Sequence, residues 1–377
     1  MIKDSNNSIS RVLFLSPLPP PYYGSAISSE MCLNILKGDK TLFVKNIKLN
    51  YSKSMSDIGT LNLKKIKGFF SVTKKIIFYK RKFNPDIIYM VPATSGFGLI
   101  RDFIFVSLID NNRKSQLIIH LRSQFLPQNF KSSFWKILIK KILRCDKQII
   151  IGKELIDNLN GFTDLKKIFF LPNAIKQSIS DEEFDSIVQK RNLNKKLHLL
   201  FLSNMVEAKG WFKVLEACVL LKNAGINFKC NFVGDWETEN DEIKFANYRS
   251  KYNLEEQVFF LGRLINKAKN NILAKTDILI FPTEYKLETF GRVIIEAMEY
   301  GIPVIANNIA TIPSIIDHGV SGFVLSKNTP KEILNYILEM NDKYRRSQMS
   351  KMARKFFLEK YTLEKYAPKF IEIIKSN

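Results

Sequence analysis

Short apolar runs alternate with helical stretches along the whole chain, and this alternation limits the possible folds more than any other feature of the sequence. Turn-forming and polar residues bound the runs, as is typical of buried strands. Strands that alternate with helices predict a mainly parallel sheet covered by helices on both faces. The runs span residues 9–16, 41–47, 87–91, 116–120, 148–152 and 167–171, then 197–203, 227–234, 257–262, 278–282, 303–306 and 322–325.

A polar stretch after Pro172 separates the two series of runs and indicates two α/β domains. The 377 residues are too many for one typical core and fit two domains of ordinary size. We predict a Rossmann-like N-terminal domain over residues 1–180 and a second Rossmann-like domain over residues 181–355. A ligand is expected between the domains, at the carboxyl ends of the strands.

The chain carries a formal net charge of +22, with lysines scattered among apolar residues. Such a surface attracts nucleic acid, an anionic membrane leaflet or phosphorylated substrates. No helix-turn-helix, zinc-finger or RNA-binding signature is present, so no specific nucleic-acid partner is expected. The apolar runs fall short of the roughly 20 residues of a spanning helix, and the polar start argues against a cleaved signal. A cytoplasmic protein is expected, with four buried thiols at Cys32, Cys145, Cys218 and Cys230.

Two carboxylates, Glu288 and Glu296, flank a loop-to-helix junction at Gly291. Unpaired N–H groups at the start of a helix, together with the helix dipole, favour an anion there. Gly291 leaves room for close backbone approach, and the carboxylates can bind hydroxyl groups. The arrangement suits a phosphorylated sugar. The spacing alone leaves an alternative for each carboxylate. Glu288 can be an exposed residue of the loop. Arg292, Glu296 and Glu299 share one helix face and can form a solvent-exposed row of salt bridges.

The segment from Glu288 to Met298 resembles the glutamate-pair motif of retaining, nucleotide-sugar-dependent glycosyltransferases of family 4, which reads Glu-x-Phe-Gly and then Glu-Ala-Met. The resemblance implies the GT-B fold, in which two doubly wound domains face each other across a cleft. It also implies that Glu296 binds the donor ribose and that Glu288 contacts the transferred sugar. Backbone contacts are expected from Phe290 and Gly291, with Arg292 as a further donor-binding candidate.

The stretch from Phe201 to Gly210 resembles the phosphate-binding segment of the same family, which commonly reads Gly-Arg, four residues, then Lys-Gly. The resemblance makes Lys209 a catalytic residue that neutralises the leaving diphosphate. Asn204 stands where arginine is usual, so part of this stabilisation must come from elsewhere. The alternative is that Lys209 is one of many surface lysines.

Two shorter segments resemble donor-binding positions of the family. Arg263 and Leu264 follow a strand where relatives contact the nucleotide base, and the guanidinium can stack on a ring or pair with phosphate. Gly24 and Ser25 occupy the place of a glycine-rich turn that approaches the donor phosphates. An ordinary loop arginine and a plain turn are the alternatives.

The first domain also supplies candidates. His120 ends an apolar strand and matches a cleft-facing histidine of the family, which makes it a catalytic candidate; the alternative is a partly buried, structural imidazole. Arg101, beside Asp102, and Arg122 are candidates for binding an acceptor's phosphate or sugar. In the proteins that this chain resembles, the last helix crosses back, so residues 356–377 are expected to pack on the first domain.

The resemblance implies a retaining hexosyltransferase that uses a nucleotide-activated hexose or N-acetylhexosamine. We expect a UDP-sugar donor and a saccharide acceptor, lipid-linked, in bacterial surface polysaccharide synthesis such as that of lipopolysaccharide or capsule. No Asp-x-Asp pair or metal-binding spacing occurs, so neither metal nor cofactor is expected to be required. Residues 64–82 alternate lysines with apolar residues. Such a segment forms either a helix that lies on the anionic inner face of the cell membrane or an amphipathic helix that packs on its own domain.

Other functions stay open at this point. A GT-B nucleotide-sugar epimerase is one alternative, although its acid–base carboxylates are not evident. A non-catalytic protein that binds sugar nucleotides or nucleic acid is another, because Asn204 replaces a charge. Further departures from the family are Ile309 and Ala310 in place of a Gly-Gly pair and Ser314 in place of an acidic residue.

Overall fold

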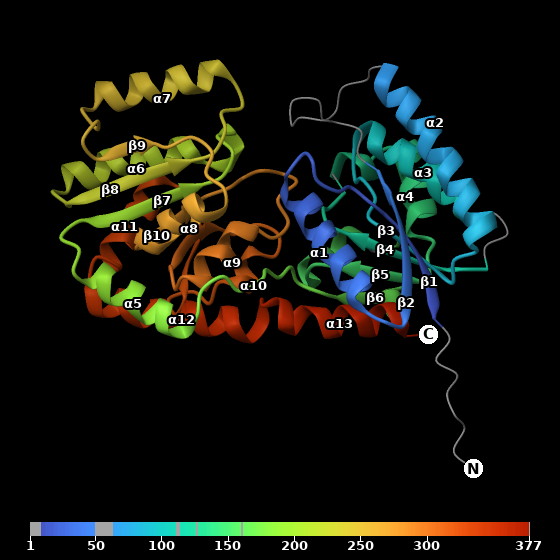
Figure 1. The fold of residues 1–377 in the computed structure, drawn as a ribbon. Helices are drawn as coiled ribbons and strands as arrows, with labels where there is room; N and C mark the ends of the chain where they lie inside the picture. The colour runs from blue at the N-terminus through green and yellow to red at the C-terminus, as the bar shows by residue number, and fades with distance from the viewer. Residues whose placement is uncertain (1–8, 50–62, 111–113, 126, 160, 377) are drawn as a thin grey trace, which may run out of the picture. The chain divides into compact units, whose positions relative to one another are not determined.

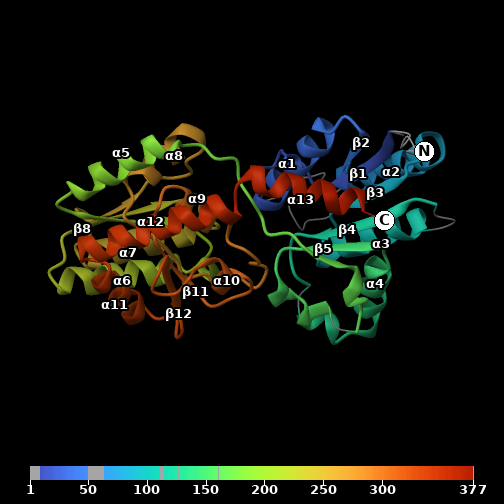
Figure 2. The ribbon, with the colours of Figure 1, turned by 90° about the horizontal axis from the view of Figure 1, so that it is seen from below.

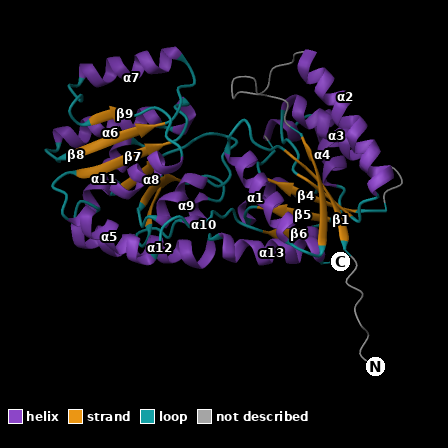
Figure 3. Ribbon diagram, in the orientation of Figure 1, coloured by secondary structure: helices purple, strands orange, loops and turns teal. Residues whose placement is uncertain are grey.

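The computed structural model describes residues 9–49, 63–110, 114–125, 127–159 and 161–376 (Figure 1). The chain divides into two compact units. The first consists of residues 1–173 and 366–377, and the second of residues 174–365. Each unit contains one six-stranded sheet whose neighbouring strands are all parallel (Figure 3).

The sheet of the first unit has the strand order β2-β1-β3-β4-β5-β6. Its central strands are continuous apolar runs, as expected when helices cover both faces of a parallel sheet. The order reverses between β1 and β3, and such a switch point opens a crevice at the carboxyl ends of the strands. The strands are β1 (Ser10–Ser16), β2 (Leu42–Lys48), β3 (Ile87–Met90), β4 (Gln116–Leu121), β5 (Lys147–Ile150) and β6 (Ile168–Phe170).

Helices cover both faces of this sheet (Figure 2). Three of them, α2, α3 and α4, share a hydrophobic core with side chains such as Leu117 and Ile119. On the other face, the thiol of Cys32 in α1 lies 3.1 Å from the hydroxyl of Tyr366 in α13. The helices are α1 (Gly24–Gly38), α2 (Leu63–Phe78), α3 (Gly96–Asp110), α4 (Ser133–Leu143) and α13 (Leu363–Lys375).

The sheet of the second unit has the order β12-β11-β10-β7-β8-β9. Its switch point lies between β7 and β10, the first and fourth strands of this unit, as in dinucleotide-binding folds. A ligand crevice is therefore expected where the loops after these two strands begin. The strands are β7 (Leu197–Leu202), β8 (Phe228–Val233), β9 (Val258–Phe260), β10 (Ile278–Phe281), β11 (Val304–Asn307) and β12 (Gly322–Leu325).

Local sequence sets the ends of several helices in this unit. Ser180 and Glu183 form a capping box at α5, and Thr238 and Thr329 cap α7 and α11 through their hydroxyl groups. The helices are α5 (Asp181–Asn192), α6 (Trp211–Asn223), α7 (Glu239–Lys251), α8 (Asn266–Lys275), α9 (Arg292–Glu299), α10 (Ile312–Ile315), α11 (Pro330–Glu339) and α12 (Lys343–Lys360).

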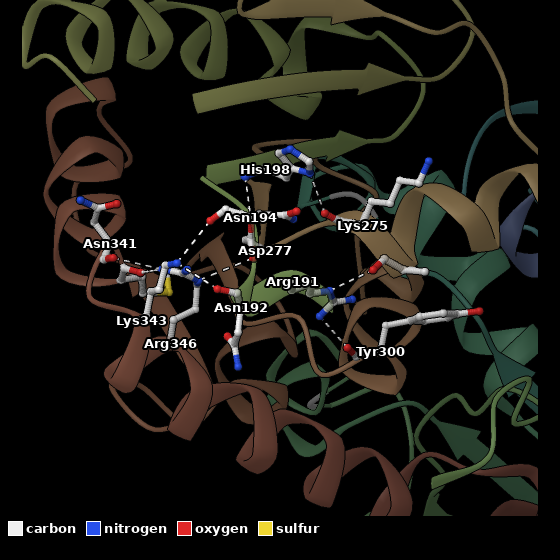
Figure 4. A network of polar contacts seen from close by, with 12 residues as sticks. Arg191, Asn192, Asn194, His198, Lys275, Asp277, Tyr300, Asn341, Lys343 and Arg346 are labelled. Carbon is white, nitrogen blue, oxygen red and sulfur yellow. Dashed lines mark hydrogen bonds and ion pairs between the residues drawn. The ribbon is translucent and has the colours of Figure 1, made fainter. Parts of the chain in front are cut away.

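A buried ionic network ties helices of the second unit to its sheet (Figure 4). The Asp277 carboxylate accepts a hydrogen bond from the His198 backbone N–H at 2.8 Å and lies 3.7 Å from the Arg346 guanidinium of α12. Arg191 of α5 donates to the carbonyls of Leu273, Ala274 and Tyr300. Burial raises the pKa of Asp277 and lowers that of Arg191 to about 10. The satisfied donors fix α5 and α12 in place.

The predicted fold is confirmed in outline, since each apolar run forms a strand. The unit boundaries differ from the prediction, lying at 173/174 and 365/366 rather than 180/181 and 355/356. Tertiary contacts explain both differences. The Ile175 N–H donates to Tyr361 O at 3.0 Å, the Ser178 N–H donates to the Glu299 carboxylate, and Arg354 of α12 donates to Glu299 O at 2.7 Å. These contacts hold residues 174–180 and α12 within the second unit.

Residues 64–82 form most of α2 and the π-helical turn that follows it. Val72 and Ile76 are buried in the core of the first unit, as expected of an amphipathic helix packed on its own domain. The same helix exposes Ile66, Phe70 and Phe78. In the described parts of the chain, no helix has both the length and the apolar character needed to span a bilayer.

Candidate active site

The loops after β7 and β10 lie next to each other at the switch point of the second unit. The Glu284 N–H in the second loop donates to the Ala208 carbonyl in the first at 2.7 Å. Gly210 allows the contact, because it has φ +87° and an added Cβ would lie 2.5 Å from the Pro282 carbonyl oxygen. The chain therefore needs glycine at this position to bring the two loops together.

Lys209 and Glu288 form an ion pair in this place. The Lys209 Nζ lies 2.6 Å from the Glu288 Oε2, and the two side chains are 15% and 14% exposed. The same ammonium group lies 4.3 Å from the centre of the Tyr285 ring, a cation–π contact. The predicted phosphate-binding lysine and the predicted sugar-binding carboxylate thus neutralise each other across the two loops.

Glu288 also occupies the start of α9. Its Oε1 accepts hydrogen bonds from the N–H groups of Gly291 at 3.0 Å and Thr289 at 3.3 Å. Gly291 has φ +67°, and an added Cβ would lie 2.9 Å from the Ile294 side chain. The protein's own carboxylate therefore binds the N–H groups at the helix N-terminus where the sequence predicts a bound anion.

Glu296 lies in the first turns of α9 and is held by two cations. Its carboxylate is 2.9 Å from Lys269 Nζ of α8 and 3.3 Å from Arg292 Nε, and it is 16% exposed. Glu299 is only 3% exposed and binds the Ser178 N–H, so these three residues of α9 do not form a solvated stripe. Glu296 is a positioned carboxylate near the surface, as a ribose-binding residue requires.

The remaining donor candidates of the second unit differ in exposure and in the residues that they contact. Asn204 is exposed, and Arg263 forms a half-exposed ion pair with Asp235, 3.3 Å between Nη1 and Oδ2. Leu264 is partly buried, whereas the Phe290 side chain is buried and packs on Tyr361. All four lie in loops at the carboxyl edge of the sheet.

The structure corrects the prediction for His120. The side chain is completely buried, and its Nδ1 lies 2.6 Å from the Tyr89 hydroxyl group. It points to the face of the sheet that α13 covers, where Tyr89 packs edge-on against Phe370. Burial, reinforced by Arg122, holds the pKa of the imidazole well below its usual range. His120 is thus a neutral interior residue and does not face a crevice.

The other candidates of the first unit line a cavity of about 820 Å³ at its switch point. Ser25, Arg101 and Arg122 are among the lining residues. Arg101 binds the Asp102 carboxylate through Nε at 2.7 Å and Nη2 at 2.9 Å, and Arg122 donates to Asn173 Oδ1 at 2.6 Å. These contacts position both guanidinium groups, and the cavity is a candidate acceptor site.

Gly24 does not show the close approach that was expected of it. A Cβ added there would meet no described atom within 4 Å. In this structure the residue simply begins α1, which agrees with the alternative of a plain turn into a helix.

Two residues of the site escape prediction from sequence. Tyr285 lies in the loop after β10, and nothing in the sequence shows that its ring contacts Lys209. Lys269 gives no signal either, because only the packing of α8 beside α9 brings it to Glu296. The described residues contain no group of three or more His, Cys, Asp or Glu side chains placed to bind a metal, and metal independence stays a prediction.

The chain is similar in sequence to known proteins. The sequence model of the family described as glycosyl transferases group 1 matches residues 183–356. An uncharacterised 41.2 kDa protein in the cps region of Klebsiella pneumoniae is 25% identical over 84% of this chain and 85% of its own length. The amylovoran biosynthesis glycosyltransferase AmsK of Erwinia amylovora is 25% identical over 45% of this chain and 42% of its own length.

Solved structures agree on the fold. HepE from Anabaena, crystallised with UDP and glucose, superposes with a TM-score of 0.72 at 17% sequence identity. The superposition covers 97% of this chain and 99% of HepE. This likeness confirms the predicted GT-B fold.

Proposed function

We propose that this protein is a retaining glycosyltransferase that uses a nucleotide diphosphate sugar, since residues 183–356 match the sequence model of the glycosyl transferases group 1 family. The proposed donor carries a hexose or N-acetylhexosamine on UDP. The proposed acceptor is a saccharide carried on a lipid, in the synthesis of a bacterial surface polysaccharide. The protein would act without a metal ion at the inner face of the cell membrane.

The observation that carries this proposal is the Lys209–Glu288 pair at the start of α9. A diphosphate arriving there competes with Glu288 for the Lys209 ammonium group and for the Gly291 N–H. Once displaced from these partners, the Glu288 carboxylate can accept hydrogen bonds from the hydroxyl groups of the sugar. The leaving group then meets one cation and the positive end of a helix, which stabilise the charge that develops during transfer.

Glu296 suits the ribose in this scheme. Lys269 and Arg292 hold its carboxylate in a fixed position, so that it can accept hydrogen bonds from two neighbouring hydroxyl groups. Because Asn204 has no charge, Lys209 provides a larger share of the electrostatic stabilisation than in relatives with an arginine there. Removal of Lys209 should accordingly affect the affinity for nucleotide more than removal of Arg263, which is paired with Asp235.

The relatives support the choice of donor and pathway. HepE was crystallised with UDP and glucose. AmsK is named as an amylovoran biosynthesis glycosyltransferase, and the Klebsiella protein is described as lying in the cps region. UDP sugars are therefore the first donors to test, and a polysaccharide intermediate is the first acceptor.

Calorimetric titration of UDP, GDP and ADP sugars tests donor binding. Wild-type protein is expected to bind UDP sugars selectively. Lys209→Ala and Glu296→Gln should each weaken binding at least about tenfold, since each removes a charge-assisted interaction. Lys141→Ala is the matched control, because its Nζ also lies 2.6 Å from a carboxylate, that of Asp110 in the first unit. Undiminished binding in the Lys209 and Glu296 variants would contradict the site assignment.

A second measurement separates transfer from the alternatives. Nuclear magnetic resonance of the donor sugar, with cell-derived lipid-linked acceptor, is expected to show a new glycosidic bond with the anomeric configuration of the donor. An epimerised sugar nucleotide formed without acceptor would instead identify an epimerase. Donor binding without any turnover would identify a non-catalytic protein.

A further inference from the structure

The cavity of the first unit has the size and location of a ligand site. Its volume of about 820 Å³ lies within the range of about 300–1,000 Å³ that is usual for small-molecule sites. The loops after β1, β3 and β4 form one end of it, where the strand order reverses. Helices α2 and α3, which pack against each other, form the other end.

The two ends differ in chemistry. Ser25, Arg122 and Ser123 line the cavity at the strand ends. The helical end presents large apolar side chains, and several of them remain open to solvent: Ile66 is 47% exposed, Phe70 58%, Phe97 59% and Ile104 36%. Exposed apolar groups gathered around one concavity mark a binding surface, since exposure of this kind is unfavourable in water.

The composition of the walls argues against a saccharide at the helical end. A sugar needs a partner for each buried hydroxyl group, and unpaired hydroxyl groups weaken binding. The side chains that α2 and α3 contribute are mostly apolar, with Lys65 and Arg101 as the polar exceptions. Among the described lining residues there is no aspartate or glutamate. An anionic head group therefore meets no negatively charged side chain on the walls of the cavity.

We propose that this cavity binds the hydrocarbon chain of a lipid phosphate, the carrier of the acceptor. The chain lies between α2 and α3, and the phosphate faces the strand ends near Ser25 and Arg122. This inference rests on the proposed function, because it places the acceptor of that reaction in the first unit. It also assigns Phe69, Phe70 and Phe97 to chain recognition, a role independent of the donor site.

A chain-length series tests the proposal directly. Alkyl phosphates of 6 to 12 carbons, kept below their micelle-forming concentrations, are titrated into the full-length protein in a calorimeter. Because each buried methylene adds about 0.8 kcal/mol, the affinity should rise about fourfold per added carbon until the cavity is filled. An affinity independent of chain length would overturn the proposal.

Paired variants on one helix provide the control. Phe70→Ser and Phe78→Ser remove aromatic rings of α2 that are 58% and 56% exposed, but only Phe70 lines the cavity. Phe70→Ser, and likewise Phe97→Ser on α3, should weaken binding of the longest chain roughly tenfold. Phe78→Ser should retain wild-type affinity. Equal losses in the Phe70 and Phe78 variants would show that the alkyl chain binds to the exposed face of α2 rather than in the cavity, and would overturn the cavity assignment.

Donor binding measured in the same samples distinguishes this inference from the proposed function. UDP-sugar binding without chain-dependent binding of alkyl phosphates overturns the cavity assignment alone. Chain-dependent binding without any binding of nucleotide sugars supports the cavity and overturns the donor assignment. Retained UDP-sugar binding in each variant shows that the second unit has folded.

Discussion

His120 is a buried titratable residue whose surroundings affect the stability of the protein. Its Nδ1 contacts the Tyr89 hydroxyl group, whereas its Nε2 has no hydrogen-bond partner in the described structure. Arg122 is the charged group that faces it, and burial together with this charge lowers the pKa of the imidazole. The folded protein therefore keeps His120 neutral at a pH at which an exposed histidine would take up a proton.

This environment predicts a loss of stability in mild acid. Below the ordinary histidine pKa of about 6.5 the unfolded chain binds a proton that the folded chain does not, so stability falls as the pH falls. The loss from His120 is at most about 1.4 kcal/mol per pH unit, until its own lower pKa is reached. Calorimetric unfolding between pH 7 and 5 should show a shallower decline for His120→Gln than for wild type.

The wild-type protein, measured at the same pH values, is the reference. An unchanged slope in His120→Gln would contradict the assignment of a buried, neutral imidazole.

The helix α13 packs on the first unit, most of which lies far from it in sequence. Phe370 is completely buried and packs on Tyr89 and Tyr366, and Lys147 of β5 donates to the Ile373 carbonyl at 2.8 Å. The helix thereby closes one face of the first sheet. It also determines that His120 is interior.

Truncation of Phe370 is expected to destabilise the first unit. Phe370→Ala removes a buried ring and should lower the free energy of unfolding of this unit by about 3–5 kcal/mol. Glu372→Ala, at an exposed position of the same helix, should have little effect. Hydrogen exchange resolved by segment measures both, and faster exchange in β3 and β4 with unchanged exchange in β7 and β10 is the expected result. Equal effects of the two substitutions would contradict the role of α13.

The sequence predicts features that neighbouring residues determine, and it fails for features that contacts with distant residues determine. The strands follow from apolar runs in the sequence, whereas the roles of Lys209 and Glu288 follow from the resemblance of their segments to the motifs of a known family. His120 was assigned wrongly, because its position at a strand end does not reveal which distant helix covers that face. The unit boundaries were displaced for a similar reason, since contacts such as Ser178 with Glu299 decide to which unit a connecting segment belongs.

For the whole molecule, the net charge of +22 predicts association with anionic membranes. Lysines near a surface of anionic lipid each add about 1 kcal/mol at physiological ionic strength, and salt screens this attraction. Sedimentation with vesicles of anionic lipid should show binding in low salt that declines as salt is added. Vesicles of neutral lipid are the control. Equal, salt-insensitive binding to both kinds would show that apolar insertion dominates.

The return of residues 366–377 to the first unit also bears on how the chain is made. The strands of the first sheet are synthesised early, but Tyr366 and Phe370 leave the ribosome only after all residues of the second unit. Domains usually fold in the order of their synthesis. Here the second unit can finish first, while one face of the first sheet still lacks α13. During that interval the nascent chain exposes the part of this face that α13 later covers, including Tyr89, and a chaperone that binds apolar surface can act on it.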